Sequence, residues 1–193
     1  ALSALLVHLL ESGEVDAVVH VAADPGSPVA NRTVVSTSRD EILRAAGSRY
    51  APSAPLAQLT ELVATGRRHA FVGKPCDAAA LRALTEDRPD VAAAFPVILS
   101  FFCAGVPSES GAQAVLAALG AQPEEVSHFR YRGQGWPGRA TAVLQDGREV
   151  SMSYHDSWGG ILSKHVQHRC KICADGTGKA ADLVCADAWE TDA

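Results

Sequence analysis

Five cysteines are the residues whose type and spacing point most directly to chemistry. Cys170 and Cys173 are separated by two residues, so both thiolates can reach one metal centre. This pair alone fits zinc, a redox pair or an iron-sulfur cluster. Cys76 and Cys103 raise the number of thiolates to four, as an all-cysteine zinc site or a 4Fe-4S cluster requires. The alternative is that Cys76 and Cys103 are ordinary buried apolar residues.

A basic segment flanks the cysteine pair, although the chain as a whole is acidic. It runs from Lys164 to Lys171 and includes Arg169. Such a run is usually a solvated face, but cationic groups beside cysteines also favour thiolates and attract anions such as phosphate. The fifth cysteine, Cys185, follows two apolar residues, and we expect it to pack rather than to bind a metal.

A glycine-rich stretch from Gly133 to Gly138 matches the G-x-G-x-x-G pattern of dinucleotide-binding loops. That pattern requires a following helix, whose N-terminus holds the pyrophosphate. The next segment is predicted to be a strand instead. We therefore interpret this stretch as a glycine-rich turn.

The elements that must position these residues alternate between strands and helices in the first part of the chain. Apolar runs with many β-branched residues predict strands over residues 15–21, 33–35, 69–72 and 97–102. Helical periodicity and stop glycines predict helices over residues 1–13, 38–47, 55–65 and 108–120, and a further helix from residue 77. This alternation predicts an α/β fold with a layered, mostly parallel sheet and flanking helices.

Two of the cysteines follow predicted strands. Cys76 ends a tight turn after one strand, and Cys103 directly follows another. The carboxyl ends of parallel strands meet at one edge of a sheet, where ligands bind, so both cysteines should lie at that edge. The helix after Cys76 is expected to bury Ala80, Leu81 and Leu84.

The pattern changes near residue 126. Three segments alternate as antiparallel strands do: residues 126–130, 140–144 and 149–154. Asp146 and Gly147 form a hairpin turn between the last two. We therefore expect an α/β region over 1–125 and, over 126–193, antiparallel strands with a cysteine-bearing loop, together in one compact unit. The first helix has neither an N-cap residue nor an initiator Met, so we expect a chain truncated at its N-terminus.

Composition excludes several classes of protein. The formal net charge of -5 argues against nucleic-acid binding, which requires a basic face. No apolar run approaches the roughly 20 residues of a membrane span. Without a signal peptide, the cysteines are expected in a reducing, cytoplasmic environment, where metal or redox chemistry is commoner than disulfide bonds.

The order of motifs resembles that of a known family, and the resemblance covers nearly the whole chain. The matching motifs are Gly47-Ser48-Arg49-Tyr50, Phe71-Val72-Gly73-Lys74-Pro75-Cys76, Phe101-Phe102-Cys103, Arg169-Cys170-Lys171-Ile172-Cys173, Ala181-Asp182-Leu183 and Asp187-Ala188-Trp189. The family is that of the beta subunits of coenzyme F420-reducing hydrogenases and dehydrogenases, which is related to divinyl chlorophyllide and 7-hydroxymethyl chlorophyll a reductases. An upstream ferredoxin-like cysteine cluster, usual in the family, is absent from this sequence.

The resemblance implies an oxidoreductase with FAD and a 4Fe-4S cluster. FAD would exchange hydride with coenzyme F420 or a related small-molecule acceptor, and single electrons with the cluster. A partner subunit or a ferredoxin would exchange electrons with the cluster. The implied cluster ligands are Cys76, Cys103, Cys170 and Cys173. The implied flavin contacts are Ser48, Arg49, Tyr50, Gly73, Lys74 and Pro75. Lys164 and Arg169 would hold FAD phosphates or offset the negative charge of the cluster.

A second interpretation remains open. The four cysteines would also suit a zinc-stabilised binding or interaction module without catalysis. Iron content, acid-labile sulfide and flavin absorbance distinguish the two interpretations. A third possibility is that the isolated chain is folded but has lost its cofactors.

Overall fold

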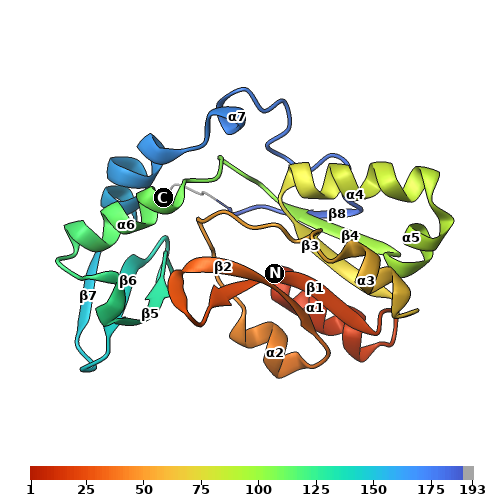
Figure 1. Cartoon of the computed structure of the whole chain (residues 1–193), viewed down its shortest axis with the longest axis horizontal. Helices are drawn as coiled ribbons and strands as arrows, with labels where there is room; N and C mark the ends of the chain where they lie inside the picture. Colours follow the sequence, from red (N-terminus) through yellow and green to blue (C-terminus); the bar gives the residue numbers. More distant parts are fainter. Residues whose placement is uncertain (189–193) are drawn as a thin grey trace.

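The computed structural model of the 193-residue chain describes residues 1–188. Its larger sheet has the strand order β2-β1-β3-β4-β8. These strands are β1 (Ala17–Asp24), β2 (Ser27–Ser36), β3 (His69–Gly73), β4 (Val97–Phe101) and β8 (Leu183–Cys185). Strand β1 is parallel to β3, β3 to β4 and β4 to β8, whereas β2 is antiparallel to β1. The predicted α/β fold with a mostly parallel sheet is thus confirmed (Figure 1).

The antiparallel strand β2 differs from the sequence prediction, which has only residues 33–35 in a short strand. The side chain of Asp24 accepts a hydrogen bond from the Gly26 N–H (2.7 Å) and stabilises a tight turn. The chain therefore returns at once beside β1, with Val19 opposite Val35. An apolar run alone does not reveal whether its neighbour is reached by a turn or by a crossover helix.

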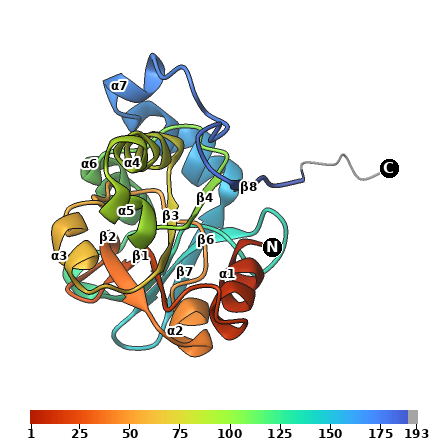
Figure 2. The same ribbon diagram turned by 90° about the vertical axis from the view of Figure 1, so that its right-hand side faces the viewer.

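Helices cover both faces of this sheet (Figure 2). On one face pack α1 (Leu2–Glu11) and α2 (Arg39–Arg44), which bury Leu6, Val7 and Ile42 against Val18, Ala70 and Leu99. On the other face pack α3 (Leu59–Ala64), α4 (Pro75–Asp87) and α5 (Pro89–Ala94), which bury Leu62, Leu81 and Val91 against Val19, Phe71 and Ile98. The sheet is therefore the middle of three layers, as parallel sheets require.

Helix α4 begins two residues earlier than predicted. Pro75 is its first residue, and Pro fits there because the first turn of a helix has no intrahelical acceptor for its N–H. Cys76 therefore lies within the first turn of the helix. Ala78 and Leu81 are buried, but Ala80 is exposed, so the predicted buried face is wrong at that position.

A second, three-stranded antiparallel sheet lies beside the first, at the left of Figure 1. It contains β5 (Val126–Arg130), β6 (Arg139–Leu144) and β7 (Glu149–Ser153), and the hairpin turn at Asp146 and Gly147 is confirmed. It packs against α6 (Glu109–Ala118), the π-helix η2 (His155–Ile161) and the 3-10 helix η3 (Leu162–His165). The short elements η1 (Pro123–Glu125) and α7 (His168–Lys171) complete the chain. Residues 133–138 form a loop that leads into β6, not into a helix.

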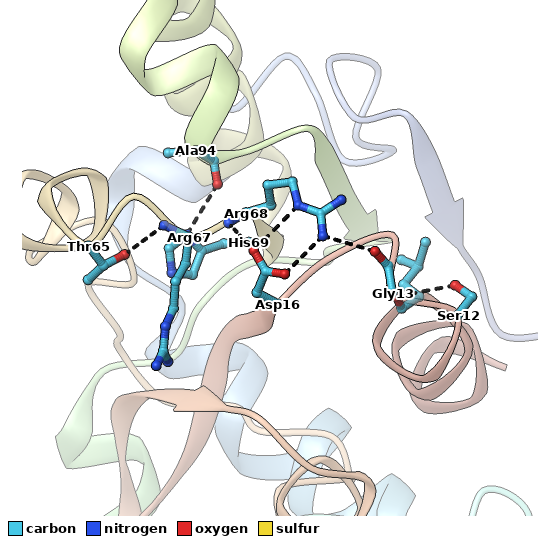
Figure 3. Close-up of polar contacts among 9 residues, drawn as sticks. Ser12, Gly13, Asp16, Thr65, Arg67, Arg68, His69 and Ala94 are labelled. Atoms are coloured by element: carbon cyan, nitrogen blue, oxygen red, sulfur yellow. Dashed lines mark hydrogen bonds and ion pairs between the residues drawn. The ribbon is translucent and has the colours of Figure 1, made fainter.

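At the amino ends of β1 and β3, a polar network joins the loop after α1 to β3 (Figure 3). The guanidinium of Arg68 pairs with Asp16 (2.9 Å) and donates to the Gly13 carbonyl (2.9 Å). Buried His69 bonds through Nδ1 with the Ala94 carbonyl (3.1 Å). These contacts lie at the edge opposite the cysteines and have a structural role. No helix over residues 1–188 has the length and apolar character to cross a membrane.

Candidate functional site

A cavity of about 660 Å³ lies at the carboxyl edge of the larger sheet. The ends of three parallel strands line it, through Gly73 of β3, Phe101 of β4 and Cys185 of β8. Its far side is formed by Arg132 and Trp158, which come from the region of the second sheet. Small-molecule and cofactor sites have volumes of about 300–1,000 Å³. The cavity is therefore large enough for an organic cofactor and lies where α/β sheets bind ligands.

The loop after α2 brings Ser48, Arg49 and Tyr50 to the wall of this cavity. The guanidinium of Arg49 is turned toward protein atoms. It donates to Asn31 Oδ1 (2.9 Å) and to the carbonyls of Pro28 (2.8 Å), Ala30 (2.6 Å) and Phe129 (3.2 Å). Burial lowers the pKa of Arg49. Arg49 thus positions the loop by holding it to β2 and β5.

Tyr50 gives the cavity an aromatic surface. Its ring lies 4.7 Å from the ring of Trp158 and 5.5 Å from that of Tyr131, centre to centre. Burial raises the pKa of the Tyr50 hydroxyl well above its usual value, and neighbouring Tyr154 raises it further. Tyr50 therefore stays neutral and offers a planar apolar face with a polar edge.

The turn from Gly73 to Pro75 places a buried cation in the wall. Lys74 is only 7% exposed, and its ammonium pairs with Asp77 (2.6 Å) and donates to Ser53 Oγ (2.8 Å). Gly73 allows this arrangement because a Cβ there would lie 2.5 Å from the Phe71 ring. Pro75 is buried and does not line the cavity. The contacts with Asp77 and Ser53 fix the position of the Lys74 ammonium at the edge of β3.

His20 of β1 also lines the cavity, although the sequence analysis did not select it. It is 6% exposed, and Nε2 lies 2.8 Å from Ser36 Oγ. Burial lowers the pKa of His20 to about 4. The imidazole is therefore neutral at pH 7 and contributes hydrogen bonding without charge. A histidine within an otherwise apolar strand is only a weak sequence signal for such a role.

Cys103 lies two residues beyond β4 and lines the cavity. Its N–H donates to the Gly176 carbonyl (2.8 Å), so the cysteine-bearing loop is attached directly beside it. Burial raises the pKa of the Cys103 thiol, and neighbouring Cys170 and Cys76 raise it further. Cysteines from three separate segments therefore lie near one another at the edge predicted from the sequence.

Close packing of Gly105 holds the cysteine-bearing loop in place. Gly105 has φ +108°, and a Cβ there would lie 2.7 Å from the Val166 side chain and 3.4 Å from that of Cys170. The thiol of Cys173 donates to the Asp175 carbonyl (3.3 Å). Cys76 and Cys173 are exposed, and all five cysteines are free thiols. Over residues 1–188, no group of three or more His, Cys, Asp or Glu side chains is arranged to hold a metal ion.

Lys164 and Arg132 are placed in ways that the sequence does not indicate. Lys164 is exposed on η3 and does not line the cavity. Arg132, in the loop after β5, does line it, although no sequence motif predicted a role for this residue. Arg132 is far in sequence from every other site residue, and its only local signal is its place beside the glycine-rich turn. The tryptophan of the Asp187-Ala188-Trp189 motif lies outside the described residues.

Two family profiles match this chain. The profile for the N-terminal part of coenzyme F420 hydrogenase/dehydrogenase beta subunits matches residues 1–61, and the profile for their C terminus matches residues 66–193.

Individual proteins are also similar. Chloroplastic 7-hydroxymethyl chlorophyll a reductase of Oryza sativa subsp. japonica is 28% identical over 181 residues, which are 93% of this chain and 37% of the reductase. A chain of the F420-reducing [NiFe] hydrogenase complex of Methanosarcina barkeri has the same fold, with a TM-score of 0.71 and 23% identity. That match covers 94% of this chain and 61% of the hydrogenase chain. This chain thus spans only part of the length of either relative.

Proposed function

The chain belongs to the coenzyme F420 hydrogenase/dehydrogenase beta subunit family, and we propose that it forms the flavin-binding part of an iron-sulfur oxidoreductase. In this proposal the cavity binds FAD, the cysteines hold a 4Fe-4S cluster, and the substrate is coenzyme F420 or a related hydride acceptor. The observation that best supports this proposal is the cavity itself, which has Cys103 in its wall. A site of cofactor size and a candidate cluster ligand thus share one surface.

The residues of the cavity suit a flavin. Tyr50 and Trp158 provide aromatic surface for a planar ring system, and Ser48 provides a hydroxyl beside it. Lys74 provides a buried positive charge for phosphate groups, close to the first turn of α4. An aromatic wall and a buried ammonium suit the two halves of a flavin nucleotide, its planar ring system and its phosphates.

The donor set suits an iron-sulfur cluster. The four cysteines provide the number of thiolates that a 4Fe-4S cluster takes, and three of them, Cys76, Cys103 and Cys170, lie near one another. The described side chains do not form a ready metal site, so we expect the exposed thiols of Cys76 and Cys173 to move inward on binding. Lys164 lies on the same segment as the cysteine pair and outside the cavity, so we assign it to offsetting cluster charge.

Bound FAD would supply hydride transfer with the substrate and single-electron transfer with the cluster. The chain's own residues bind and shield the site. Lys74 stays paired with Asp77 and favours added negative charge nearby. His20 stays neutral at pH 7 and keeps its hydrogen bond with Ser36, so it adds no charge to the cavity. Tyr50 and Trp158 exclude water from the aromatic side of the cavity.

A partner subunit or a ferredoxin would exchange electrons with the cluster. Apolar side chains are exposed close to the cysteines, with Phe102 58% and Ile172 76% exposed. Phe102 directly precedes Cys103, and Ile172 lies between Cys170 and Cys173. Such residues favour a docking surface over the cluster, where the electron path into a partner would be shortest.

A zinc-stabilised interaction module is the alternative. It accounts for the cysteines but gives no role to a cavity of about 660 Å³ lined by Tyr50, Lys74 and His20. The cavity therefore favours the flavin proposal.

Filling the cavity tests this proposal. Ser48→Trp places a large ring in the cavity wall, and we expect it to abolish FAD binding measured by equilibrium dialysis. Leu43→Trp is the matched control, because Leu43 is 45% exposed nearby and does not line the cavity. Equal FAD binding by both variants and the unsubstituted chain would place the flavin elsewhere.

A further inference from the structure

Arg132 lies at the wall of the cavity beside two aromatic rings. Its side chain is only 11% exposed and lines the cavity. The guanidinium lies over two aromatic rings, 5.0 Å from the centre of Trp136 and 5.6 Å from that of Tyr154. Aromatic faces stabilise a guanidinium and fix its plane without using its N–H donors.

The hydrogen bonds of Arg132 are few. Nη2 donates to Asp187 Oδ2 at 2.8 Å, and this is its one hydrogen bond with a residue in the range 1–188. A guanidinium carries five N–H donors, so four of them bond no residue in the range 1–188. Arg49, in contrast, directs four hydrogen bonds to protein acceptors. Arg49 is therefore a structural residue, whereas Arg132 retains unused binding capacity.

The partner of Arg132 is weakly held. Asp187 is 46% exposed and lies on the segment that follows strand β8, the short edge strand of the sheet. Asp187 itself lines the cavity. Because Asp187 is partly exposed, water can solvate its carboxylate when it leaves, and a ligand anion that takes its place keeps the largely buried Arg132 paired. An incoming anion with two or three oxygen acceptors would form more hydrogen bonds with the planar guanidinium than Asp187 does.

We propose that Arg132 is the anion-recognition residue of the cavity, and that Asp187 is an exchangeable internal carboxylate that occupies Arg132 until a ligand displaces it. The ligand group is a phosphate or a carboxylate. Two sources fit this chemistry: the diphosphate of the flavin nucleotide, or an acidic group of the substrate. The inference rests on the proposed function only for the identity of the ligand, because the cavity and the guanidinium define an anion site without it.

The test uses three probes on the full chain: inorganic pyrophosphate, FAD and riboflavin, each titrated by isothermal calorimetry. Arg132→Gln removes the planar guanidinium and its charge, and we expect pyrophosphate affinity to fall about tenfold or more. Arg132→Lys keeps the charge without the planar guanidinium and should bind with intermediate affinity. Asp187→Asn removes the competing carboxylate, and we expect pyrophosphate affinity to rise by up to about fivefold.

The flavin probes identify the source of the anion. If the flavin diphosphate occupies Arg132, Arg132→Gln lowers FAD affinity to that of riboflavin. If an acidic substrate group does, the variant lowers pyrophosphate affinity and leaves FAD affinity unchanged. Both results support the proposal.

A matched pair of exposed residues provides the control. Arg88 and Asp90 form an ion pair away from the cavity, so Arg88→Gln and Asp90→Asn should change no titration. The proposal is overturned if Arg132→Gln and Asp187→Asn bind pyrophosphate like the unsubstituted chain. Failure of FAD and riboflavin to bind any variant, with pyrophosphate still responding to Arg132, would instead overturn the flavin function alone.

Discussion

His20 shows how burial of one side chain makes stability depend on pH. Its pKa falls from 6.5 to about 4 on folding, so the unfolded chain binds the proton more tightly. The neutral histidine therefore contributes full stability above pH 6.5, and this contribution is lost as the pH falls toward 4. The shift corresponds to about 3 kcal/mol across that window. Urea unfolding at several pH values measures it.

The comparison that isolates this effect uses His20→Gln. This variant should lose most of the pH dependence between pH 6.5 and 4, although His69, whose pKa burial also lowers, retains its own contribution. Exposed His8 on α1 is the control, and His8→Gln should keep the full dependence. Parallel stability curves for the unsubstituted chain and His20→Gln would show that His20 does not titrate in this way.

Single substitutions test which cysteines bind the cluster. Cys103→Ser and Cys173→Ser should each lose most of the iron bound after anaerobic reconstitution, because a 4Fe-4S cluster needs four thiolates. Cys185→Ser should keep its iron, since we assign Cys185 to packing beside the cavity. Atomic absorption measures the iron. Loss of iron from Cys185→Ser, with retention in Cys103→Ser, would show that the ligand set is wrong.

At the scale of elements, the tight turn from β3 into α4 depends on one glycine. A Cβ at Gly73 would lie 2.5 Å from the Phe71 ring and 2.8 Å from Asp77 Cβ. Gly73→Ala should therefore lower the free energy of unfolding by about 1–3 kcal/mol, through displacement of buried Phe71. Gly160→Ala is the control, because a Cβ there has no neighbour within 4 Å. Equal urea midpoints for both variants would argue against this close packing.

The attachment of the cavity loop to the two sheets depends on Arg49. Arg49→Lys removes the planar guanidinium that reaches Pro28, Ala30 and Phe129, and leaves partly buried carbonyls without this donor. We expect a loss of about 3 kcal/mol in the free energy of unfolding, because hydrogen bonds to charged groups are strong and unsatisfied acceptors are costly. Arg39→Lys, in an exposed pair with Glu11, should change stability by less than about 1 kcal/mol. Similar losses in the two variants would contradict the role of Arg49.

At the scale of the whole molecule, local sequence patterns predicted individual helices and strands better than they predicted which elements lie side by side. The helix predicted from residue 38 is α2, with Ser38 as its N-cap residue. Apolar runs also located β3 and β4, and with them the cavity edge and Cys103. Local sequence failed for β2, whose direction depends on a turn, and for Arg132, whose neighbours Asp187 and Tyr154 are distant in sequence. Such contacts arise only once the two sheets have packed together.

Arg49 shows the same dependence on the surrounding fold. The motif predicts a flavin contact, which stays a prediction, and in the structure Arg49 lines the cavity while its guanidinium donates to acceptors on β2 and β5. A motif therefore predicted the position of the loop correctly, whereas the direction of one side chain depends on the surrounding fold.

Cofactor content after reconstitution shows whether the chain is an iron-sulfur flavoprotein or a zinc-bound module. The chain would be incubated anaerobically with FAD, iron, sulfide and zinc, desalted, and analysed for flavin absorbance, metals and acid-labile sulfide. We expect a brown protein with one FAD and about four iron and four sulfide ions per chain. A colourless protein that carries stoichiometric zinc and no flavin would contradict the assignment as an iron-sulfur flavoprotein.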